Sequence, residues 1–302
     1  GHRGLPSAKL FTNLDKLVAG DKFIMRVLDE VLTYEVDQIL PMVDKDDHET
    51  LENALKIEEG EDQVTLFTCT PYGVNTERLL VRGHRVEYVE QEVEAEKTLF
   101  SGISIHTNYL LWVIVGLLVT AVFIVVLYKK EQKLKKRRAE QAADGQEAPV
   151  LQDRTVTGDA DTETEKKLMK KKISVILFGL LFLVGFGILI YPTVSNQWNT
   201  YRQSQLISNY QSVVQDMTPE DFTQEWERAE AFNATITQNN LYSDVFGEST
   251  TDLQSTEYWK ILNEAGDGIM GYLSIPKINI KLAIYHGTAD DVLQTGVGHL
   301  NG

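Results

Sequence analysis

The chain has 302 residues, of which 24% are charged and 43% hydrophobic, with one cysteine and a formal net charge of −15. This length allows one or two compact domains, and the apolar share excludes a wholly disordered chain. A single thiol excludes an internal disulfide framework and a cysteine-ligated zinc site. The strongly negative charge argues against a partner such as DNA.

The first hundred residues are typical of a β-rich domain. Four stretches rich in Val, Leu, Ile and Thr predict short strands, namely FIMRV, LTYEVDQI, DQVTLFTC and RLLVRGHRVEYV. Strands at this close spacing favour an all-β barrel or sandwich.

The last two of these strands carry the residues with the most chemistry. Cys69 ends one strand and Arg78 begins the next, with TPYGVNTE between them. In an antiparallel hairpin with Cys69 opposite Arg78, Phe67 faces Leu80, and the thiol and the guanidinium lie on one face. Neighbouring strands are about 4.8 Å apart, so the pattern predicts that both groups reach one substrate.

A lone cysteine next to a cation suggests a nucleophile. An ordinary thiol with a pKa of about 8.5 is only about 3% thiolate at neutral pH, and a nearby cation raises that fraction. A histidine would also donate a proton to a leaving amine, but spacing alone does not choose among the six histidines of the chain. The alternative is a buried, inert cysteine beside a surface arginine.

Two uncharged stretches predict membrane-spanning helices. Residues 109–128 and 173–191 contain no charge over 20 and 19 residues. At a rise of about 1.5 Å per residue, each is long enough for a bilayer core of about 30 Å.

The connector between the two stretches, residues 129–172, sets the expected topology. It carries KKEQKLKKRR at one end and KKLMKKK at the other, which places it in the cytoplasm by the positive-inside rule. Its middle lacks aromatic residues and is typical of a disordered linker. We therefore expect a two-pass plasma-membrane protein with residues 1–108 and 192–302 outside the cell. A nuclear-localisation or nucleic-acid-binding patch is the less favoured interpretation of the basic clusters.

The second half of the connector resembles the start of a protein with a signal anchor, because Met169 is followed by lysines and an apolar run. A cleaved signal peptide is the rival interpretation, although ILIYPTVSNQW offers no small-x-small cleavage site. After the second apolar stretch, the sequence predicts a capped helix with an apolar stripe that serves packing. The residues concerned are Thr218, Pro219 and Asp221 at its start, and Phe222, Trp226 and Ala229 in the stripe.

The motif TLFTCTPYGVNTERLLVRGHR closely resembles the active-site hairpin of class C sortases, the pilin-polymerising transpeptidases of Gram-positive bacteria. The segment GHRGLPSAKLFTNLDKLVAGD resembles the region around the catalytic histidine of that family. The resemblance implies that Cys69 is the nucleophile, that His2 is the general acid or ion-pair partner, and that Arg78 stabilises the tetrahedral oxyanion. The apolar stretch 109–128 after the barrel also fits class C.

The end of the chain is similar to a different part of the same family. MGYLSIPKINIKLAIYHGTADDVLQTGVGHLNG resembles the first strands of a class C barrel. The loop LYSDVFGES stands where the family has its lid, usually an Asp-Pro-aromatic triplet. Asp244 and Phe246 match that triplet, but Val245 replaces the proline, which leaves lid gating in doubt.

The implied fold is mainly β, a sortase-like barrel split into two halves, with two transmembrane helices and a helical and lid region. In chain order these are 1–105 (C-terminal half of the barrel with the catalytic hairpin), 109–128, 129–172, 173–191, 192–268 (helices and lid) and 269–302 (first strands of a barrel). The simplest interpretation is a piece of a longer sequence that joins the end of one sortase to the beginning of another. The alternatives are that the two halves close one barrel, or that each pairs with another sortase half. The family's stretch between GHLNG and GHRGLP is missing, which would leave a barrel edge unpaired.

The resemblance implies a cysteine transpeptidase that cleaves a Leu-Pro-x-Thr-Gly-type sorting signal and joins the acyl group to a pilin lysine during pilus assembly. The expected partners are pilin subunits and the membrane, with no nucleic acid, no metal and no organic cofactor. One alternative is a non-catalytic membrane-anchored fragment or scaffold in a pilus locus. The other is a sortase that anchors proteins to the cell wall.

Overall fold

The computed structural model describes residues 1–88 except 57 and 59, residues 158–236 and 256–300, and scattered positions between 116 and 140. The chain divides into two compact units. The first unit contains Gly1–Gly102 and Ile190–Gly302, and the second contains Ile103–Leu189.

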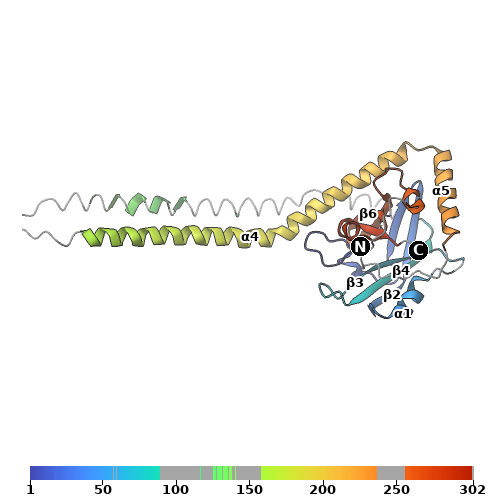
Figure 1. The fold of residues 1–302 in the computed structure, drawn as a ribbon, viewed down its shortest axis with the longest axis horizontal. Helices are drawn as coiled ribbons and strands as arrows, with labels where there is room; N and C mark the ends of the chain where they lie inside the picture. The colour runs from blue at the N-terminus through green and yellow to red at the C-terminus, as the bar shows by residue number, and fades with distance from the viewer. Residues whose placement is uncertain are drawn as a thin grey trace, which may run out of the picture. The chain divides into compact units, whose positions relative to one another are not determined.

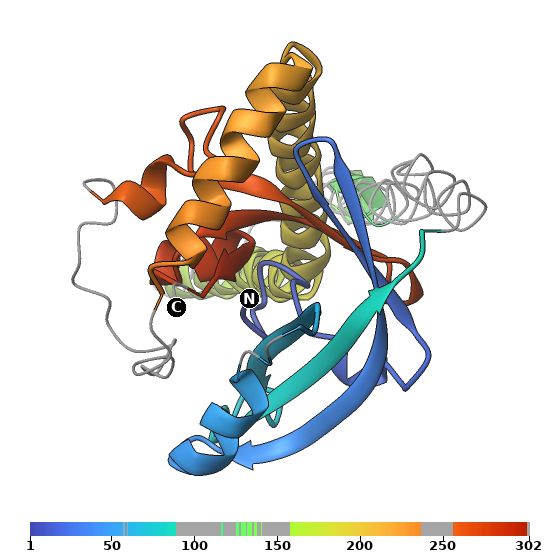
Figure 2. The same ribbon diagram turned by 90° about the vertical axis from the view of Figure 1, so that its right-hand side faces the viewer.

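The first unit is built on one curved sheet of seven strands, in the order β3-β4-β2-β1-β5-β6-β7 (Figures 1 and 2). All neighbouring strands are antiparallel except β6 and β7, which are parallel. The strands are β1 Lys22–Val27, β2 Glu30–Asp44, β3 Gln63–Thr70, β4 Glu77–Val86, β5 Ile269–Ile275, β6 Ile280–His286 and β7 Val297–His299. The four strands predicted in the first hundred residues are therefore present, and β2 is longer than expected.

The curvature of the sheet has a local cause in β2. Its pairing with β4 shifts register between Val36 and Gln38 and again between Leu40 and Val43. Such irregularities bend a strand and increase its twist, which curls a sheet toward a half-barrel. The arrangement fits the sortase-like β architecture predicted from the sequence.

The centre of the sheet joins the two ends of the chain. Strand β1 pairs with β5, with Met25 opposite Leu273 and Arg26 opposite Tyr272. The backbones approach closely here, because a Cβ atom added at Gly271 would lie 2.5 Å from the Arg26 carbonyl oxygen. The two segments predicted as halves of a barrel thus contribute to a single sheet in this structure.

The core of the first unit draws on both of these segments. Phe23, Leu14 and Val81 are fully buried beside Leu273 and Ile275. Each such side chain contributes about 1.5–3 kcal/mol when removed from water. The first and last parts of the chain therefore share one hydrophobic core.

Short helices surround the sheet, and their bounds are α1 His48–Leu55, α5 Pro219–Asn233, α6 Glu257–Lys260 and α7 Asp290–Thr295, with 3-10 turns at Leu14–Lys16 and Pro276–Ile278. The predicted start of α5 is confirmed, because Thr218 and Asp221 form a reciprocal capping box. The predicted packing role of the stripe is also confirmed, since Phe222, Trp226 and Ala229 contact the core.

The long helix α4, Gly158–Gln215, differs from one predicted element. It begins inside the linker 129–172 that was predicted to be disordered, since this part contains Lys, Glu, Leu and Met, which are good helix formers. It continues past residue 191 into the region predicted to be helical, with Pro192 inside it.

The part of α4 in the first unit packs on β5 and β6. Ile207 and Tyr210 form a cluster with Ile269, Tyr272 and Ala283. Gln203 adds polar contacts, because its side-chain oxygen accepts a hydrogen bond from the Ala283 N–H and its amide group donates to the Thr295 carbonyl.

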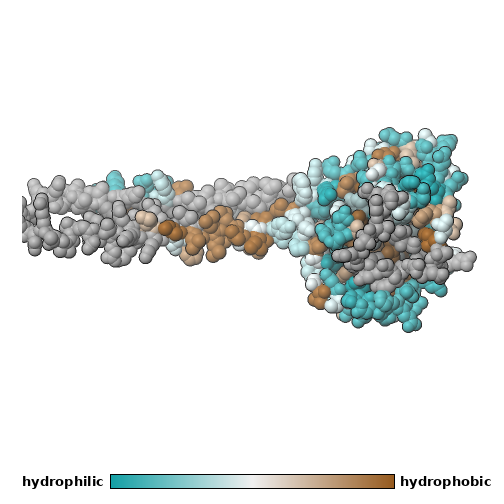
Figure 3. All heavy atoms as spheres, in the orientation of Figure 1, coloured by the Kyte–Doolittle hydropathy of each residue, from teal (hydrophilic) through white to brown (hydrophobic). Residues whose placement is uncertain are grey.

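In the second unit, the described part of α4 presents apolar side chains to its surroundings (Figure 3). Those more than half exposed are Met169, Ile173, Leu177, Phe178, Leu180, Leu181, Phe182, Leu183, Val184, Ile188 and Leu189. Among the described residues, one helix has the length and composition to cross a membrane, Leu177–Gln215. The other predicted span, 109–128, lies mostly outside the described residues. Its Gly116 lies against Phe186, since an added Cβ would be 3.3 Å from that ring.

Candidate active site

The predicted hairpin is confirmed in its register. Strands β3 and β4 place Cys69 opposite Arg78 and Phe67 opposite Leu80. Directly opposed residues of an antiparallel pair have Cβ atoms about 4.5–5.5 Å apart and point to the same face. The thiol and the guanidinium therefore start from neighbouring positions on one face of the sheet.

Both of these groups are shielded from solvent. Cys69 is 6% exposed and Arg78 is 3% exposed. Nη1 of Arg78 donates to the carbonyl oxygens of Asn75 and Glu77, each at 3.1 Å. These bonds tie the guanidinium to the hairpin loop, which satisfies part of the hydrogen bonding that a buried cation requires.

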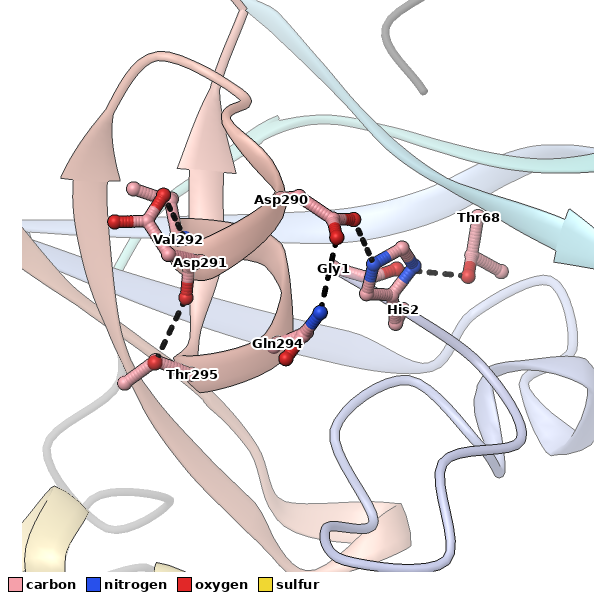
Figure 4. Close-up of polar contacts among 8 residues, drawn as sticks. All are labelled: Gly1, His2, Thr68, Asp290, Asp291, Val292, Gln294 and Thr295. Carbon is pink, nitrogen blue, oxygen red and sulfur yellow. Dashed lines mark hydrogen bonds and ion pairs between the residues drawn. The ribbon is translucent and has the colours of Figure 1, made fainter. Parts of the chain in front are cut away.

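His2 lies in the irregular segment before β1 and contacts the other end of the chain (Figure 4). Its Nε2 is 3.3 Å from Oδ1 of Asp290, the first residue of α7. The second oxygen of that carboxylate accepts a hydrogen bond from the Gln294 side chain at 3.0 Å. A carboxylate held in this way orients the imidazole ring. Sequence reasoning did not single out Asp290, because nothing local links positions 2 and 290.

Two hydrogen bonds bring the backbone around His2 to strand β3. The Thr68 hydroxyl donates to the Gly1 carbonyl at 2.8 Å (Figure 4). Nη1 of Arg3 donates to the Thr70 hydroxyl at 2.9 Å. The residues on either side of His2 thus bind the residues on either side of Cys69. The three residues predicted as catalytic belong to one region of the first unit, and their roles remain predictions.

The first unit contains a cavity of about 710 Å³ whose lining includes neighbours of His2 and Cys69 but not these two residues themselves. It is lined by Leu66 and Phe67 of the cysteine strand, by Gly1 next to His2, and by Leu293 and Val297 of the last segment. Both ends of the chain therefore build its wall.

The predicted lid residues Asp244 and Phe246 lie outside the described residues. Within the part of the chain that the structure describes, no three His, Cys, Asp or Glu side chains gather as metal ligands would. The side chains predicted to be catalytic supply a thiol, an imidazole and a guanidinium.

These features occur in a segment with a family match. Residues 1–86 match the sortase domain family model. The matched segment contains His2, Cys69 and Arg78, while Asp290 lies outside it. No curated protein matches the chain.

Solved sortases resemble part of the chain. Sortase C from Streptococcus pneumoniae is 53% identical, over 29% of this chain and 44% of that one, with a TM-score of 0.27. Sortase C1 from Streptococcus agalactiae is 56% identical, over 30% and 44%, with a TM-score of 0.27. Sortase C-1 from Actinomyces oris is 45% identical, over 29% and 46%, with the same TM-score. The chain thus spans less than half the length of each of these sortases.

Proposed function

We propose that this chain acts as a cysteine transpeptidase of the class C sortase type. The observation that carries the proposal is the register of Cys69 opposite Arg78 within a segment that matches the sortase domain. A nucleophile, a cation on the same face and a nearby imidazole are the groups that acyl transfer through a thioester requires.

In the first half of the reaction, the Cys69 thiolate attacks the threonine carbonyl carbon of a Leu-Pro-x-Thr-Gly-type signal. The carbon–nitrogen bond to glycine breaks, and the His2 imidazolium gives its proton to the departing amine. The product on the protein is a thioester. Arg78 stabilises the negative oxygen of the tetrahedral intermediate, and loss of one such donor costs about 3–4 kcal/mol of transition-state stabilisation.

In the second half, a lysine amine of a pilin subunit attacks the thioester carbonyl. The amine gives a proton to the neutral His2 ring, the carbon–sulfur bond breaks, and the thiolate and imidazolium are restored. The choice of a pilin as partner is supported by the sortase C of Streptococcus pneumoniae, whose structure is described in terms of pilin substrate specificity. The two half-reactions balance without a metal or an organic cofactor.

The first and last segments act together as one enzyme in this proposal. Support comes from the pairing of β1 with β5, from the contact between His2 and Asp290, and from the cavity that both segments line. A crosslink tests it in a Cys69→Ala background, with Ile24→Cys and Ser274→Cys at opposed positions. One enzyme predicts a disulfide within the chain, whereas disulfides only between chains would favour halves that belong to two enzymes.

We further place both segments outside the cell, with the connector in the cytoplasm. Strands from before and after the apolar stretches lie in one sheet, so the chain has to cross the membrane an even number of times between them. The exposed apolar side chains of α4 and the approach of Gly116 to Phe186 support a hairpin of two spanning helices.

A membrane-impermeant thiol reagent on intact cells tests this topology in the Cys69→Ala background. Met42→Cys, at a position that is 60% exposed on β2, should be labelled. Lys133→Cys, in the connector, should react only after the cells are opened. Labelling of Lys133→Cys on intact cells would contradict the topology.

The activity itself is tested with the full chain in detergent, a fluorogenic Leu-Pro-x-Thr-Gly peptide and a lysine-bearing peptide. We expect cleavage and a new isopeptide-linked product, both absent in Cys69→Ala. Arg78→Lys should lower kcat by about 100-fold to 1,000-fold, because one donor to the oxyanion is lost. Arg82→Lys is the matched control, since Arg82 lies on the same strand and binds Asp37.

Other outcomes assign a different function. A folded protein with no cleavage, in which Cys69 reacts no faster than a free cysteine, would be a non-catalytic scaffold. Transfer to a peptidoglycan-type amine in preference to the lysine peptide would indicate a sortase that anchors proteins to the cell wall.

A further inference from the structure

The hydrogen bonds between the two predicted reactive segments have an unusual symmetry. Gly1 and Arg3 flank His2, while Thr68 and Thr70 flank Cys69. Gly1 is bound to Thr68 and Arg3 is bound to Thr70, at 2.8 and 2.9 Å. The bonds hold the histidine segment against β3 at two points, one on each side of the reactive residues.

The threonine side chains that make these bonds and the Cys69 side chain point to opposite faces of β3. Successive side chains of a strand point to opposite faces, so Thr68 and Thr70 share a face and Cys69 points to the other. Both threonines are buried, with exposed fractions of 0% and 5%. The contacts therefore engage the face of β3 opposite to the one to which Cys69 points, and they leave the Cys69 side chain itself out of the set.

Arg3 is the central member of this set. Its side chain is 8% exposed and meets three acceptors at once. Nε donates to the Thr12 carbonyl at 3.2 Å, Nη1 to the Thr70 hydroxyl at 2.9 Å and Nη2 to the Asp15 carboxylate at 2.6 Å. Only a planar, rigid fork of donors can reach three such acceptors, and lysine, a flexible stem with a point charge, cannot replace it.

We propose that Arg3 and Thr70, with Gly1 and Thr68, form a clamp that sets the position of the His2 imidazole relative to the Cys69 thiol. Arg3 is a positioning residue in this proposal, which rests on the proposed transpeptidase function. The segment before β1 has no regular structure apart from one 3-10 turn, and the backbone of His2 is bonded to Leu293 and Phe11, so the bonds to Thr68 and Thr70 are what ties it to β3. A misplacement of about 1 Å in a catalytic pair can lower the rate by about 100-fold.

The first test removes one acceptor. Thr70→Val keeps the shape of the side chain and deletes the hydroxyl that Arg3 binds, while Thr70→Ser keeps that hydroxyl. We expect Thr70→Val to lower kcat by about tenfold or more with little change in KM, and Thr70→Ser to restore most of the rate. The pH profile of Cys69 alkylation should also move in Thr70→Val, because the imidazole is displaced from the thiol.

The second test removes the donor. Arg3→Lys should produce at least the kcat loss of Thr70→Val and a change of the alkylation profile in the same direction, because it also disturbs the bonds to Thr12 and Asp15. The double variant should be no worse than Arg3→Lys alone, since that variant has already lost the contact with Thr70. Arg82→Lys again serves as control, because it also replaces a forked arginine bound to an aspartate but leaves the clamp intact.

These readouts separate the failure of the clamp from the failure of the transpeptidase. If wild-type protein is active, and the variants lose rate only in proportion to their unfolded fraction with an unchanged alkylation profile, the clamp is overturned and the function stands. Additive effects in the double variant would also overturn it. If wild-type protein neither cleaves the peptide nor shows a reactive Cys69, the transpeptidase and the clamp fall together.

Discussion

The β3–β4 hairpin and the β1–β5 junction are both antiparallel pairs of the same sheet, but they form in different ways. The hairpin joins strands separated by a short loop, and its pairing follows from nearby residues. The junction joins residue 24 to residue 274, at the two ends of the chain. Closing such a long loop costs more conformational entropy than closing a hairpin.

This difference shows which contacts the proposed active site depends on. The hairpin carries Cys69 and Arg78, and its β3–β4 pairing joins strands that are close together along the chain. The position of His2 against Asp290, and the cavity wall, depend on the distant segment being in place. We therefore expect the largest effect at the backbone contact between the two segments and the smallest effect at a contact between close neighbours along the chain.

The largest effect is expected from Gly271→Val. A side chain at this position would overlap the Arg26 carbonyl, so the junction has to separate or distort. We expect a loss of about 3 kcal/mol of unfolding free energy, with amides of β1 and β5 losing protection from hydrogen exchange while the β3–β4 hairpin keeps it. Gly179→Val, where an added Cβ meets no atom within 4 Å, is the control. Equal loss of protection in both strand pairs would contradict the distinction.

A smaller loss is expected from His286→Phe at the end of β6. Both ring nitrogens of His286 lie near carbonyl oxygens, Nδ1 at 2.9 Å from Gly268 and Nε2 at 2.7 Å from Ile261, and the residue is 1% exposed. Phenylalanine keeps an aromatic ring but leaves these buried carbonyl oxygens without the imidazole as a partner, which should lower the free energy of unfolding by about 2 kcal/mol. Chemical denaturation measures the change, and His84→Phe, at a more exposed position, should alter stability by less than about 0.5 kcal/mol. If His286→Phe and His84→Phe lower the stability equally, the hydrogen bonds of the buried His286 ring do not make a particular contribution.

A loss of about 1 kcal/mol is expected from Tyr210→Phe. The hydroxyl accepts from the Leu28 N–H at 2.8 Å and donates to the Met270 carbonyl at 3.2 Å, so it bridges the two segments beside the junction. Thermal unfolding of the variant should show this loss, and Tyr201→Phe, at an exposed position of the same helix, should show none. If Tyr210→Phe unfolds at the same temperature as the wild-type protein, the hydroxyl bridge does not stabilise the junction.

The smallest effect is expected at a purely local contact, the cap of α5. The Thr218 N–H and hydroxyl donate to the Asp221 carboxylate and hold the pKa of Asp221 below its usual range. Its contribution is therefore present above the ordinary carboxyl pKa and is lost as pH falls through the lowered value. Hydrogen exchange at the first turn of α5 should rise in acid beyond the intrinsic change, and Asp221→Asn should remove that dependence. Glu220→Gln is the control and should keep the pH dependence. If the pH dependence of exchange survives in Asp221→Asn, it arises from another group.

The local sequence pattern correctly predicted the elements whose formation depends on residues close together along the chain. The alternation of apolar residues and the turn between them predicted the hairpin and its Cys69–Arg78 register, and the Thr218–Asp221 spacing predicted the cap of α5. The predicted disorder of residues 129–172 does not hold from Gly158 onward, because low aromatic content does not prevent a segment with Glu and Lys from forming a helix. No signal in the sequence linked His2 to Asp290 or Arg3 to Thr70, since these contacts join segments with no pattern in common.

The sequence by itself determined the strands near the cysteine, the apolar helix and the identity of the reactive groups, because periodicity, turn residues and side-chain chemistry act over a few positions. Only the tertiary structure decided that the two ends of the chain share one sheet and one core. It also decided which side chains hold the histidine segment against the cysteine strand. Those outcomes depend on shape and burial between distant segments, and a pairing of this kind leaves no periodic trace in either segment alone.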